Sequence, residues 1–497
     1  MSSPFEWLIF LPFAGGVITF LLPGKSRPWL ALLLTVGTFA AAWWLASDVW
    51  REGPQGYALG GWEAPLGINL YADGLSALLL LTTSAVMTLA SFYSLGYFSR
   101  EAEASSWTEA RAFVPLWLFL LGSLNALFVS RDLFNLYVAL ELLTIAGVAL
   151  VALAGGATAL RAGMRYLLAA FLASLLYLMG VALLYGEFGV LDLALIADAA
   201  EGGTRAPVIA LAFVFLGLGI KAALFPFHAW LPHAHASAPA PVSAVLSALV
   251  VKAAFYVILR LWVDVFADSV TAPAAQAAGA LGAAGILWGS FQALREQRLK
   301  LVVAHSTVAQ VGYLFLLFPL LTGVGEGAWR FDAWAGGVYH MMSHAFAKGA
   351  LFLAAGTILY AYGNDQISAM RGLTRTLPIT TVSFGIAGIA LVGLPPSGSF
   401  IAKWMLLTAT IESAQWWWAV VIGAGTLLSG AYVYRLVSAA FTPDTLPESI
   451  RPVPRVMEYA SLILALTSLG LGLRAAEPFD LLEVGAPFSM IVAGVGT

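Results

Sequence analysis

The sequence predicts an all-α polytopic membrane protein with about fourteen transmembrane helices, counted from the length of helix that crosses a bilayer. Three observations predict this class. Of the 497 residues, 60% are hydrophobic and only 10% are charged, whereas a soluble chain of this length needs far more polar surface. Apolar stretches of about 20 residues recur from end to end, each long enough to span a bilayer. Two of these stretches are interrupted by proline-containing segments.

The expected spans are helices separated by short loops, none of which is long enough to form a soluble catalytic domain. We expect the spans near residues 6–23, 28–47, 75–96, 113–129, 133–155, 163–186, 207–230, 239–262, 276–293, 301–321, 333–361, 378–410, 416–440 and 456–473. The first span lacks the basic start and the small-residue cleavage site of a signal peptide, so we expect it to be retained.

Each interrupted span carries a lysine beside the interruption. Pro226 follows Lys221 in LGLGIKAALFPFHAW, and a Pro-Pro-Ser-Gly-Ser cluster precedes Lys403 in GLPPSGSFIAKW. Broken helices at bilayer depth line cavities and mark ion sites in transporters built from repeats. Because each break falls in the fourth span of a group of five, we expect two five-helix repeats. The expected divisions are 1–112 (three helices), 113–262 (first repeat), 276–440 (second repeat) and 441–497 (last helix and tail).

Basic residues alternate between successive connections of the chain. If the N-terminus is outside, the cytoplasmic connections carry Lys25, Arg27, Arg100, Arg111, Arg161, Arg165, Arg295, Arg298, Lys300, Arg371, Arg375, Arg451 and Arg455. The opposite side has scattered arginines, such as Arg205, and acidic loops such as ADAAEGG. Cytoplasmic loops are rich in lysine and arginine, so we expect both termini to be extracytoplasmic in a bacterial-type inner (plasma) membrane.

Two charged residues at span ends receive a structural interpretation. Lys300, beside Arg295 and Arg298, is interpreted as a cytoplasmic anchor of the positive-inside type. Asp73, in YADGLS, is interpreted as the N-cap of the third helix.

Ionisable residues inside the spans carry the functional prediction. A central Lys or Asp costs about 2.5–3.5 kcal/mol on insertion scales, so such residues face the bundle interior and have a function. Glu141 lies in LYVALELLTIAGVAL and Lys221 lies in a neighbouring span, so we expect their side chains to face each other. Burial and a nearby carboxylate act in opposite directions on the pKa of a lysine, so such a contact controls the release of a proton.

A second set of ionisable residues lies on one helix of the second half. The stretch YHMMSHAFAKGALF spaces His340, His344 and Lys348 four apart, on one helix face. Histidine titrates near pH 6.5, so this face suits a proton relay, although separate polar contacts to neighbouring helices are the alternative. The two histidines also have zinc-ligand spacing, but no carboxylate lies between them as in H-E-x-x-H, so no metal is predicted.

The residues predicted to transfer protons are Glu141, Lys221, Lys252, His340, His344, Lys348 and Lys403, with His228, His233 and His305 as further candidates. The chain has no cysteine, which excludes disulfides and thiolate ligands. It has no nucleotide-binding loop, nucleophile triad or redox ligand set, so we expect no cofactor, no catalytic site of its own and no nucleic-acid binding. The energy must come from an ion gradient or another subunit.

Three motifs of the sequence are specific: DLFNLYVALELL, KAALFPFHAWLPHAHASAPAPVSAVLSALVVKA and GLPPSGSFIAKW. They resemble motifs of one family, the antiporter-like proton-translocating membrane subunits. Members include the D subunit of Mrp-type cation/proton antiporters, subunits of respiratory complex I and homologues in membrane-bound hydrogenases. The resemblance implies fourteen helices with two inverted five-helix repeats.

The resemblance also implies individual roles. It makes Glu141 the acid of helix five, Lys221 the central lysine of helix seven and Lys252 the lysine of helix eight. It further makes His340 and His344 connecting histidines and Lys403 the terminal residue of the path.

The predicted function is proton translocation in a multisubunit Na+/proton antiporter of the Mrp type, with other membrane subunits, the lipid bilayer, protons and Na+ as partners. One alternative is a proton-pumping subunit of a redox-driven complex related to complex I or hydrogenases. The other is a proton-coupled membrane partner of an inorganic-carbon uptake system.

Overall fold

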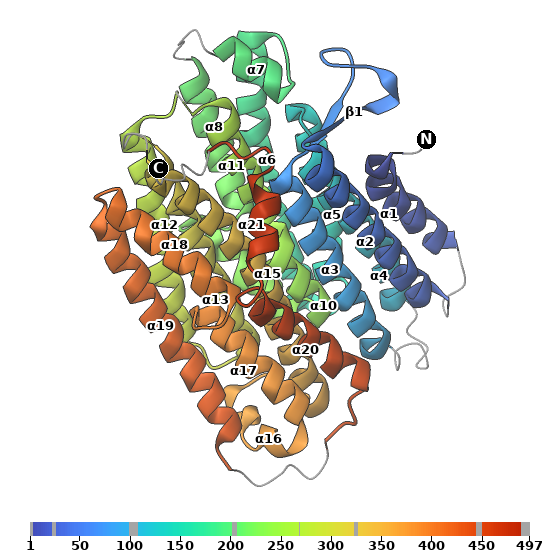
Figure 1. The fold of residues 1–497 in the computed structure, drawn as a ribbon. Helices are drawn as coiled ribbons and strands as arrows, with labels where there is room; N and C mark the ends of the chain where they lie inside the picture. Colours follow the sequence, from blue (N-terminus) through green and yellow to red (C-terminus); the bar gives the residue numbers. More distant parts are fainter. Residues whose placement is uncertain are drawn as a thin grey trace.

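The computed structural model describes residues 3–21, 26–98, 108–200, 206–267, 269–322, 327–443 and 450–488. Lys25, Arg100 and Arg205, which the topology prediction uses, lie outside these residues, and so does part of the acidic loop ADAAEGG. The described chain is a bundle of long helices with one short two-stranded sheet (Figure 1).

The N-terminal part contains three long helices and a hairpin. Its elements are α1 (Pro4–Leu21), α2 (Arg27–Glu52), β1 (Gln55–Ala58), the 3-10 turn η1 (Leu59–Gly61), β2 (Asn69–Ala72) and α3 (Gly74–Tyr97). The two strands are antiparallel, with Gln55 opposite Ala72. The side chain of Asp73 accepts a hydrogen bond from the Ser76 N–H at 3.0 Å, which confirms Asp73 as the N-cap of α3.

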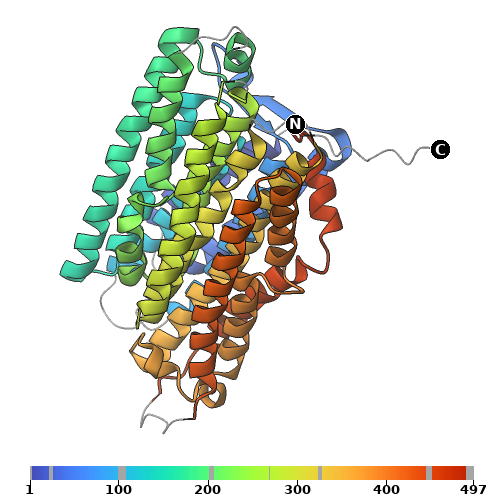
Figure 2. The same ribbon diagram turned by 90° about the vertical axis from the view of Figure 1, so that its left-hand side faces the viewer.

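The next segment contains the first broken span. Its elements are α4 (Thr108–Val129), α5 (Leu133–Ala152), α6 (Gly156–Phe188), α7 (Leu193–Ala200), α8 (Ala206–Lys221), η2 (Phe227–Ala229), α9 (Trp230–Ser237), α10 (Ala240–Val245), η3 (Leu246–Val250), α11 (Val251–Arg260) and η4 (Leu261–Val265). The segments η3 and η4 are π-helical and flank α11. Helices α6 and α8 lie side by side at one edge of the bundle (Figure 2).

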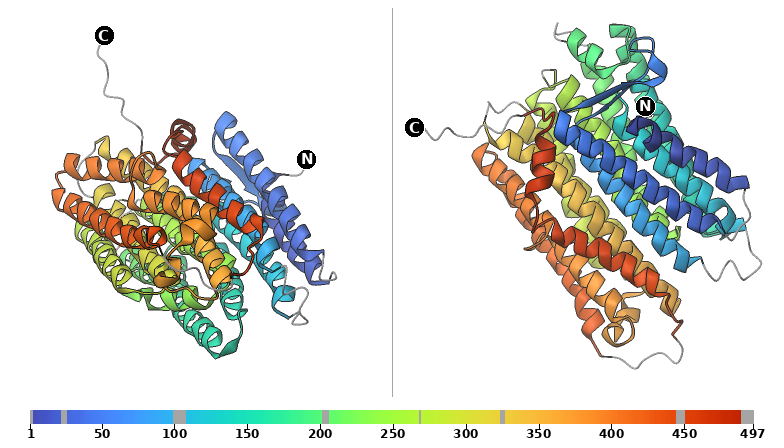
Figure 3. Two further views of the ribbon diagram at one scale, coloured as in Figure 1. Left: turned by 90° about the horizontal axis from the view of Figure 1, so that it is seen from below. Right: turned by 45° about the vertical axis from the view of Figure 1, so that its right-hand side comes forward.

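The second half contains the second broken span. Its elements are α12 (Ala272–Arg295), α13 (Leu299–Phe315), α14 (Leu317–Leu321), α15 (Trp329–Tyr362), η5 (Ile367–Met370), α16 (Leu373–Thr376), α17 (Pro378–Val392), α18 (Gly398–Glu412), α19 (Trp416–Phe441), α20 (Arg455–Gly470) and α21 (Ala476–Glu483). The 34-residue α15 is buried along most of its length. The last helices, α20 and α21, pack against α3, so the C-terminal helices contact the N-terminal part of the described chain (Figure 3).

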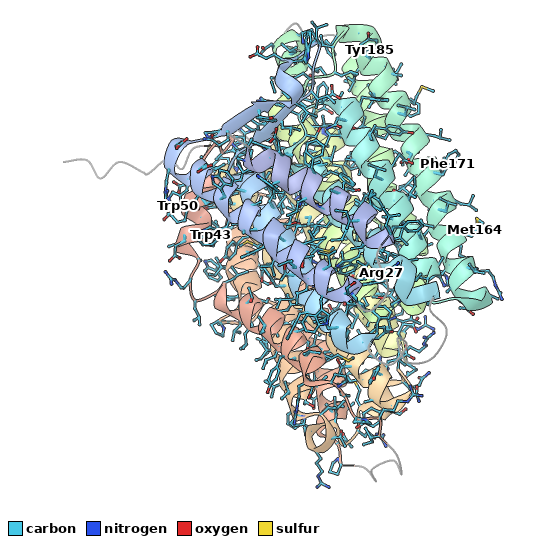
Figure 4. The ribbon with its side chains drawn as sticks, turned by 90° about the vertical axis from the view of Figure 1, so that its right-hand side faces the viewer. Arg27, Trp43, Trp50, Met164, Phe171 and Tyr185 are labelled. Carbon is cyan, nitrogen blue, oxygen red and sulfur yellow. The ribbon has the colours of Figure 1, made fainter. Side chains whose placement is uncertain are left out.

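Eleven helices of the described residues are long and apolar enough to cross a membrane. The other three predicted spans hold shorter helices, because α8, α17 and α20 have 16, 15 and 16 residues. The all-α membrane fold is therefore confirmed, but the count of fourteen spans is not. The outward faces of the long helices carry large apolar side chains, such as Trp43 on α2 and Phe171 on α6, which are 62% and 57% exposed (Figure 4). Such faces suit a lipid or protein environment.

The two ends of the bundle differ. We call the end that carries the β1–β2 hairpin and α7 the hairpin end, and the end that carries α16 the α16 end (Figure 1). Tyr57 of the hairpin donates to Glu6 at 2.5 Å, and the Gly74 N–H donates to the Val484 carbonyl at 2.8 Å. The start of α1 and the residues after α21 therefore lie at the same end, as an even number of crossings requires.

Candidate functional site

An ion pair lies where the first broken helix ends. Lys221 is the last residue of α8, and its Nζ lies 3.2 Å from Glu141 Oε1 on α5 and 2.9 Å from Thr144 Oγ1. Glu141 also accepts a hydrogen bond from Ser174 on α6. Lys221 is 8% exposed, whereas the Glu141 side chain is 25% exposed. The prediction that the two side chains face each other is confirmed.

The break itself places this lysine. After Lys221 the chain leaves the helix through Ala223, whose φ of 56° is in the left-handed region. The Leu224 N–H returns to the Gly219 carbonyl at 2.9 Å, and the Trp230 indole donates to the Ile220 carbonyl at 3.0 Å. These bonds satisfy the carbonyls that the break would otherwise leave unpaired inside the bundle.

Lys252 is held by the first π-helical segment. This residue is 2% exposed, and its Nζ donates to the Ser247 carbonyl at 2.7 Å. A π-helical turn makes wider hydrogen-bonded rings than an α-turn and often occurs at functional positions. The Ser247 hydroxyl is paired with Thr307 of α13 at 2.7 Å, so the segment links the two halves of the molecule.

The histidine stripe lies on α15 as predicted. The rings of His340 and His344 are parallel, with centroids 5.6 Å apart, and both residues are fully buried. None of their four ring nitrogens has a hydrogen-bond partner among the described protein groups. One turn further on, Lys348 donates to the Val303 carbonyl at 2.7 Å and to Ser306 Oγ at 2.5 Å.

The second broken helix holds Lys403 across its gap. Helix α17 ends at Val392, and Lys403 of α18 donates to the Val392 carbonyl at 2.9 Å. Its Nζ also lies 4.4 Å from the centre of the Tyr313 ring, which is 5.5 Å from the His340 ring. Gly393 has a φ of 85°, and an added Cβ would lie 2.8 Å from Lys403 Cδ. A glycine at this position therefore leaves room for the lysine side chain.

The geometry brings some predicted residues together and leaves others apart. Glu141 meets Lys221, and His340 lies between His344 and Tyr313. No hydrogen bond joins a lysine to a histidine among the described residues. Lys252, Lys348 and Lys403 each donate to a backbone carbonyl instead. These separate lysine–carbonyl hydrogen bonds fit the alternative of local polar contacts. The unpaired histidine rings fit a hydrated relay, because buried polar atoms normally have protein or water partners. The relay stays a prediction.

The three further histidine candidates share a pocket of about 780 Å³ at the α16 end. His228, His233 and His305 line it together with arginines of α6 and with Glu296. His305 Nε2 lies 3.7 Å from Glu296 Oε1. Partial burial and the neighbouring charge of Arg165 lower the pKa of His233. This group is therefore separate from the buried lysines and borders the bundle surface.

Two further residues were misjudged or missed. Lys300, interpreted as a cytoplasmic anchor at the edge of a span, is 2% exposed and donates to the Ala238 carbonyl at 2.6 Å, so it is buried between helices and not solvated. His235 is fully buried, and its ring is stacked on Phe352 with centroids 4.5 Å apart. Both residues are buried because helices pack over them, and such packing cannot be predicted from the linear sequence.

Sequence reasoning also missed an ionic cluster at the hairpin end. Arg260 of α11 donates to Asp73 through two nitrogens, at 2.7 and 2.5 Å, and to Asp264 at 3.1 Å. The available signal was the four-residue spacing of Lys252, Tyr256, Arg260 and Asp264. Among the described residues, no group of three or more His, Asp or Glu side chains is arranged to hold a metal ion.

Buried lysines beside two helix breaks, with one paired carboxylate, define a class of polytopic ion-translocating membrane proteins. Residues 130–429 match the family model described as "NADH:quinone oxidoreductase/Mrp antiporter, TM", and the chain belongs to that family.

Two relatives show the range of proteins that this chain resembles, and one solved structure shares its fold. The chain is 34% identical to the N subunit of the NADH-quinone oxidoreductase of Desulforudis audaxviator (strain MP104C), over 86% of this chain and 85% of that protein. It is 30% identical to the D subunit of the Na(+)/H(+) antiporter of Bacillus subtilis (strain 168), over 88% and 86%. A chain of the Mrp complex from Dietzia sp. DQ12-45-1b shares the fold, with a TM-score of 0.87, 23% identity and 98% coverage of both chains.

Proposed function

We propose that this chain is the proton-translocating subunit of a multisubunit monovalent cation (Na+)/proton antiporter. The observation that carries the proposal is the pairing of Lys221 with Glu141 at the end of a broken helix inside the membrane. A lysine and a carboxylate at this depth are costly and are kept where an ion or proton passes.

In the proposed mechanism, the Lys221–Glu141 ion pair controls whether Lys221 holds or releases its proton. While Lys221 contacts Glu141, its ammonium faces an opposite charge and the hydroxyl of Thr144. When the contact opens, the ammonium loses that support, and desolvation favours release of the proton. Since α8 ends at Lys221, a small movement at the break changes this distance without moving the whole helix.

The remaining proposed carriers lie further along the bundle. The released proton passes to Lys252 and then along α15, past Lys348 and His344 to His340, which lies beside Tyr313 on the side of Lys403. Water between the unpaired imidazoles supplies the links, because their nitrogens can both donate and accept. Lys403, at the second break, is the last buried carrier of this line.

The orientation of the chain in the membrane is part of the proposal. The exposed arginines Arg161, Arg165, Arg371 and Arg375 are all at the α16 end, which supports a cytoplasmic position for that end. The hairpin end, with both described termini, would then face the outside of a bacterial-type inner membrane. The names of the relatives, which are subunits, support assembly with other membrane subunits, and the lipid bilayer surrounds them.

A second candidate function is proton pumping in a redox-driven complex. It is favoured by the 34% identity to an NADH-quinone oxidoreductase subunit over most of both chains. Lys221 and Glu141 would then still transfer the proton, but electron transfer in other subunits would supply the energy.

The test is transport in inverted membrane vesicles that contain the complete complex. Added Na+ should collapse a preformed pH gradient, and Lys221→Ala should abolish this because the proposed proton carrier is removed. The amount of complex should stay normal, since the remaining Glu141 side chain is 25% exposed and can be solvated. A gradient that only an electron donor can build would favour the redox candidate. Normal transport by Lys221→Ala at normal abundance would contradict both.

A further inference from the structure

A polar stripe runs from Lys252 toward the hairpin end. Lys252, Tyr256, Arg260 and Asp264 are spaced four apart along α11 and η4, so they share one helix face. The first residue of the stripe is a buried lysine of the proposed path, and the last is a carboxylate with 36% of its side chain exposed. The stripe therefore connects the interior of the bundle with one of its ends.

Tyr256 is the next residue of the stripe after Lys252 and is also buried. It is 3% exposed, and its hydroxyl donates to the Phe128 carbonyl at 2.9 Å. The same hydroxyl lies 3.2 Å from Ser76 Oγ and accepts from Arg260 Nε at 3.2 Å. A hydroxyl both donates and accepts, so this contact set suits the passing of a proton between neighbours.

Beyond Tyr256, Arg260 lies between two carboxylates, those of Asp73 and Asp264. Arg260 binds both oxygens of Asp73 and also donates to Ser76 Oγ at 3.0 Å. The Asp73 side chain is 3% exposed, so proton acceptors continue from the exposed Asp264 to a buried carboxylate and then to a hydroxyl. Arginine keeps its proton in proteins, so Arg260 acts as a fixed positive charge between them.

A pocket of about 330 Å³ opens onto these groups. Its lining includes Asp73, Tyr256, Arg260 and Asp264, and also residues of the segment that follows α21. In that segment Gly485 has a φ of 76°, and an added Cβ would lie 2.8 Å from Asp73 Cβ. Helix α21 packs beside α3 (Figures 1 and 3). Gly485 and Pro487, which follow α21, form one wall of the pocket.

A structural clamp between α3 and α11 is the competing explanation. Such a clamp needs only Arg260 and Asp73, which already form a two-point ion pair. It does not account for a pocket that reaches the buried Tyr256, or for the second carboxylate at its rim. A clamp also leaves unexplained why Tyr256 and Asp264 lie on the same helix face as Lys252.

We propose that this stripe is a proton path between Lys252 and the aqueous phase at the hairpin end, with the pocket as its mouth. A proton passes between Asp264 at the mouth and Lys252 inside the bundle by way of Asp73 and the hydroxyls of Ser76 and Tyr256. The fixed charge of Arg260 holds the carboxylates in place and repels other cations. The inference rests on the proposed function, because it gives Lys252 its own exchange route.

The first test is proton translocation by the complex reconstituted in liposomes. Tyr256→Phe keeps the ring and removes the bridging hydroxyl, so the rate should fall at least about tenfold, which is less than the roughly hundredfold or more contributed by a positioned acid or base. Tyr177→Phe is the matched control, since Tyr177 is also buried and donates to a backbone carbonyl, that of Leu133, at 3.1 Å. That variant should translocate at the normal rate.

Two further variants separate the outcomes. If Tyr256→Phe does not accumulate, Asp264→Asn decides, because this half-exposed side chain makes a single ion pair; a normal rate in that variant overturns the inference. If Lys221→Ala abolishes translocation while Tyr256→Phe and Asp264→Asn are normal, the stripe is only a clamp and the proposed function stands. If Lys221→Ala is also normal, the proposed function fails first.

The second test uses the absence of cysteine from the chain, so that a thiol reagent can label this subunit only at an introduced cysteine. Val263→Cys lines the pocket and should react with a charged, membrane-impermeant thiol reagent added at the hairpin end only. Leu124→Cys, at a fully buried position, should not react from either side. No reaction at Val263→Cys, or equal reaction from both sides, would overturn the proposed mouth.

Discussion

The two helix breaks use the same backbone device with different electrostatics. At the first break, Lys221 faces the carboxylate of Glu141. At the second, Lys403 faces a backbone carbonyl and the ring of Tyr313. A full negative charge supports an ammonium more strongly than a dipole or a ring does. Under the proposed function, we infer that the first break switches a charge by making and breaking an ion pair, whereas the second receives a proton without a counter-charge.

The largest expected effect comes from removing the counter-charge at the first break. Glu141→Gln keeps the size and the contact with Ser174 but leaves Lys221 without an opposite charge. We expect proton translocation to fall by at least about a hundredfold, within the range for loss of a positioned proton-transfer group. The measurement is the initial rate in vesicles, normalised to the amount of complex.

Glu187→Gln is the matched control for that experiment. Glu187 is an exposed glutamate near the end of α6 and has no ion pair among the described residues. It should translocate normally. A Glu141→Gln variant with most of its activity would remove the distinction between the two breaks, because Lys221 would then work without a counter-charge as Lys403 does.

A smaller effect is expected from the backbone of the second break. Gly393→Ala places a Cβ in the left-handed region and against Lys403, so the free energy of unfolding should fall by about 1–2 kcal/mol. Gly385→Ala, within α17 and facing open space, should leave stability unchanged or raise it slightly. Thermal unfolding of the purified complex in detergent compares the two. Equal stability would show that the gap at Gly393 does not depend on glycine.

The sequence predicted the features that are local or chemically costly. The breaks, the burial of Lys221 and the opposition of Glu141 follow from proline and from isolated charges in apolar spans. The pairing of Arg260 with Asp73 was missed because it joins α3 to α11, residues far apart in the sequence. The burial of Lys300 was missed for a related reason, since only packing takes a residue at the edge of a span out of water.

The predicted count of fourteen spans stays unconfirmed, because three of the predicted spans contain helices shorter than the other eleven. Hydropathy treats 207–230 and 378–410 as continuous stretches, but each breaks into shorter helices near its lysine. A proline marks the region of such a break but not the residue at which the helix ends. The π-helical turns beside Lys252 leave no simple sequence signal either, although one of them supplies the carbonyl that this lysine binds.

The central claim is that Lys221 gives up and regains a proton, beyond carrying a charge. Lys221→Arg tests it most directly, because arginine keeps a positive charge that can pair with Glu141 but does not deprotonate in proteins. In liposomes containing the complex, we predict that proton translocation by this variant is lost while the amount and composition of the complex are normal. Translocation at the wild-type rate by Lys221→Arg would contradict the account.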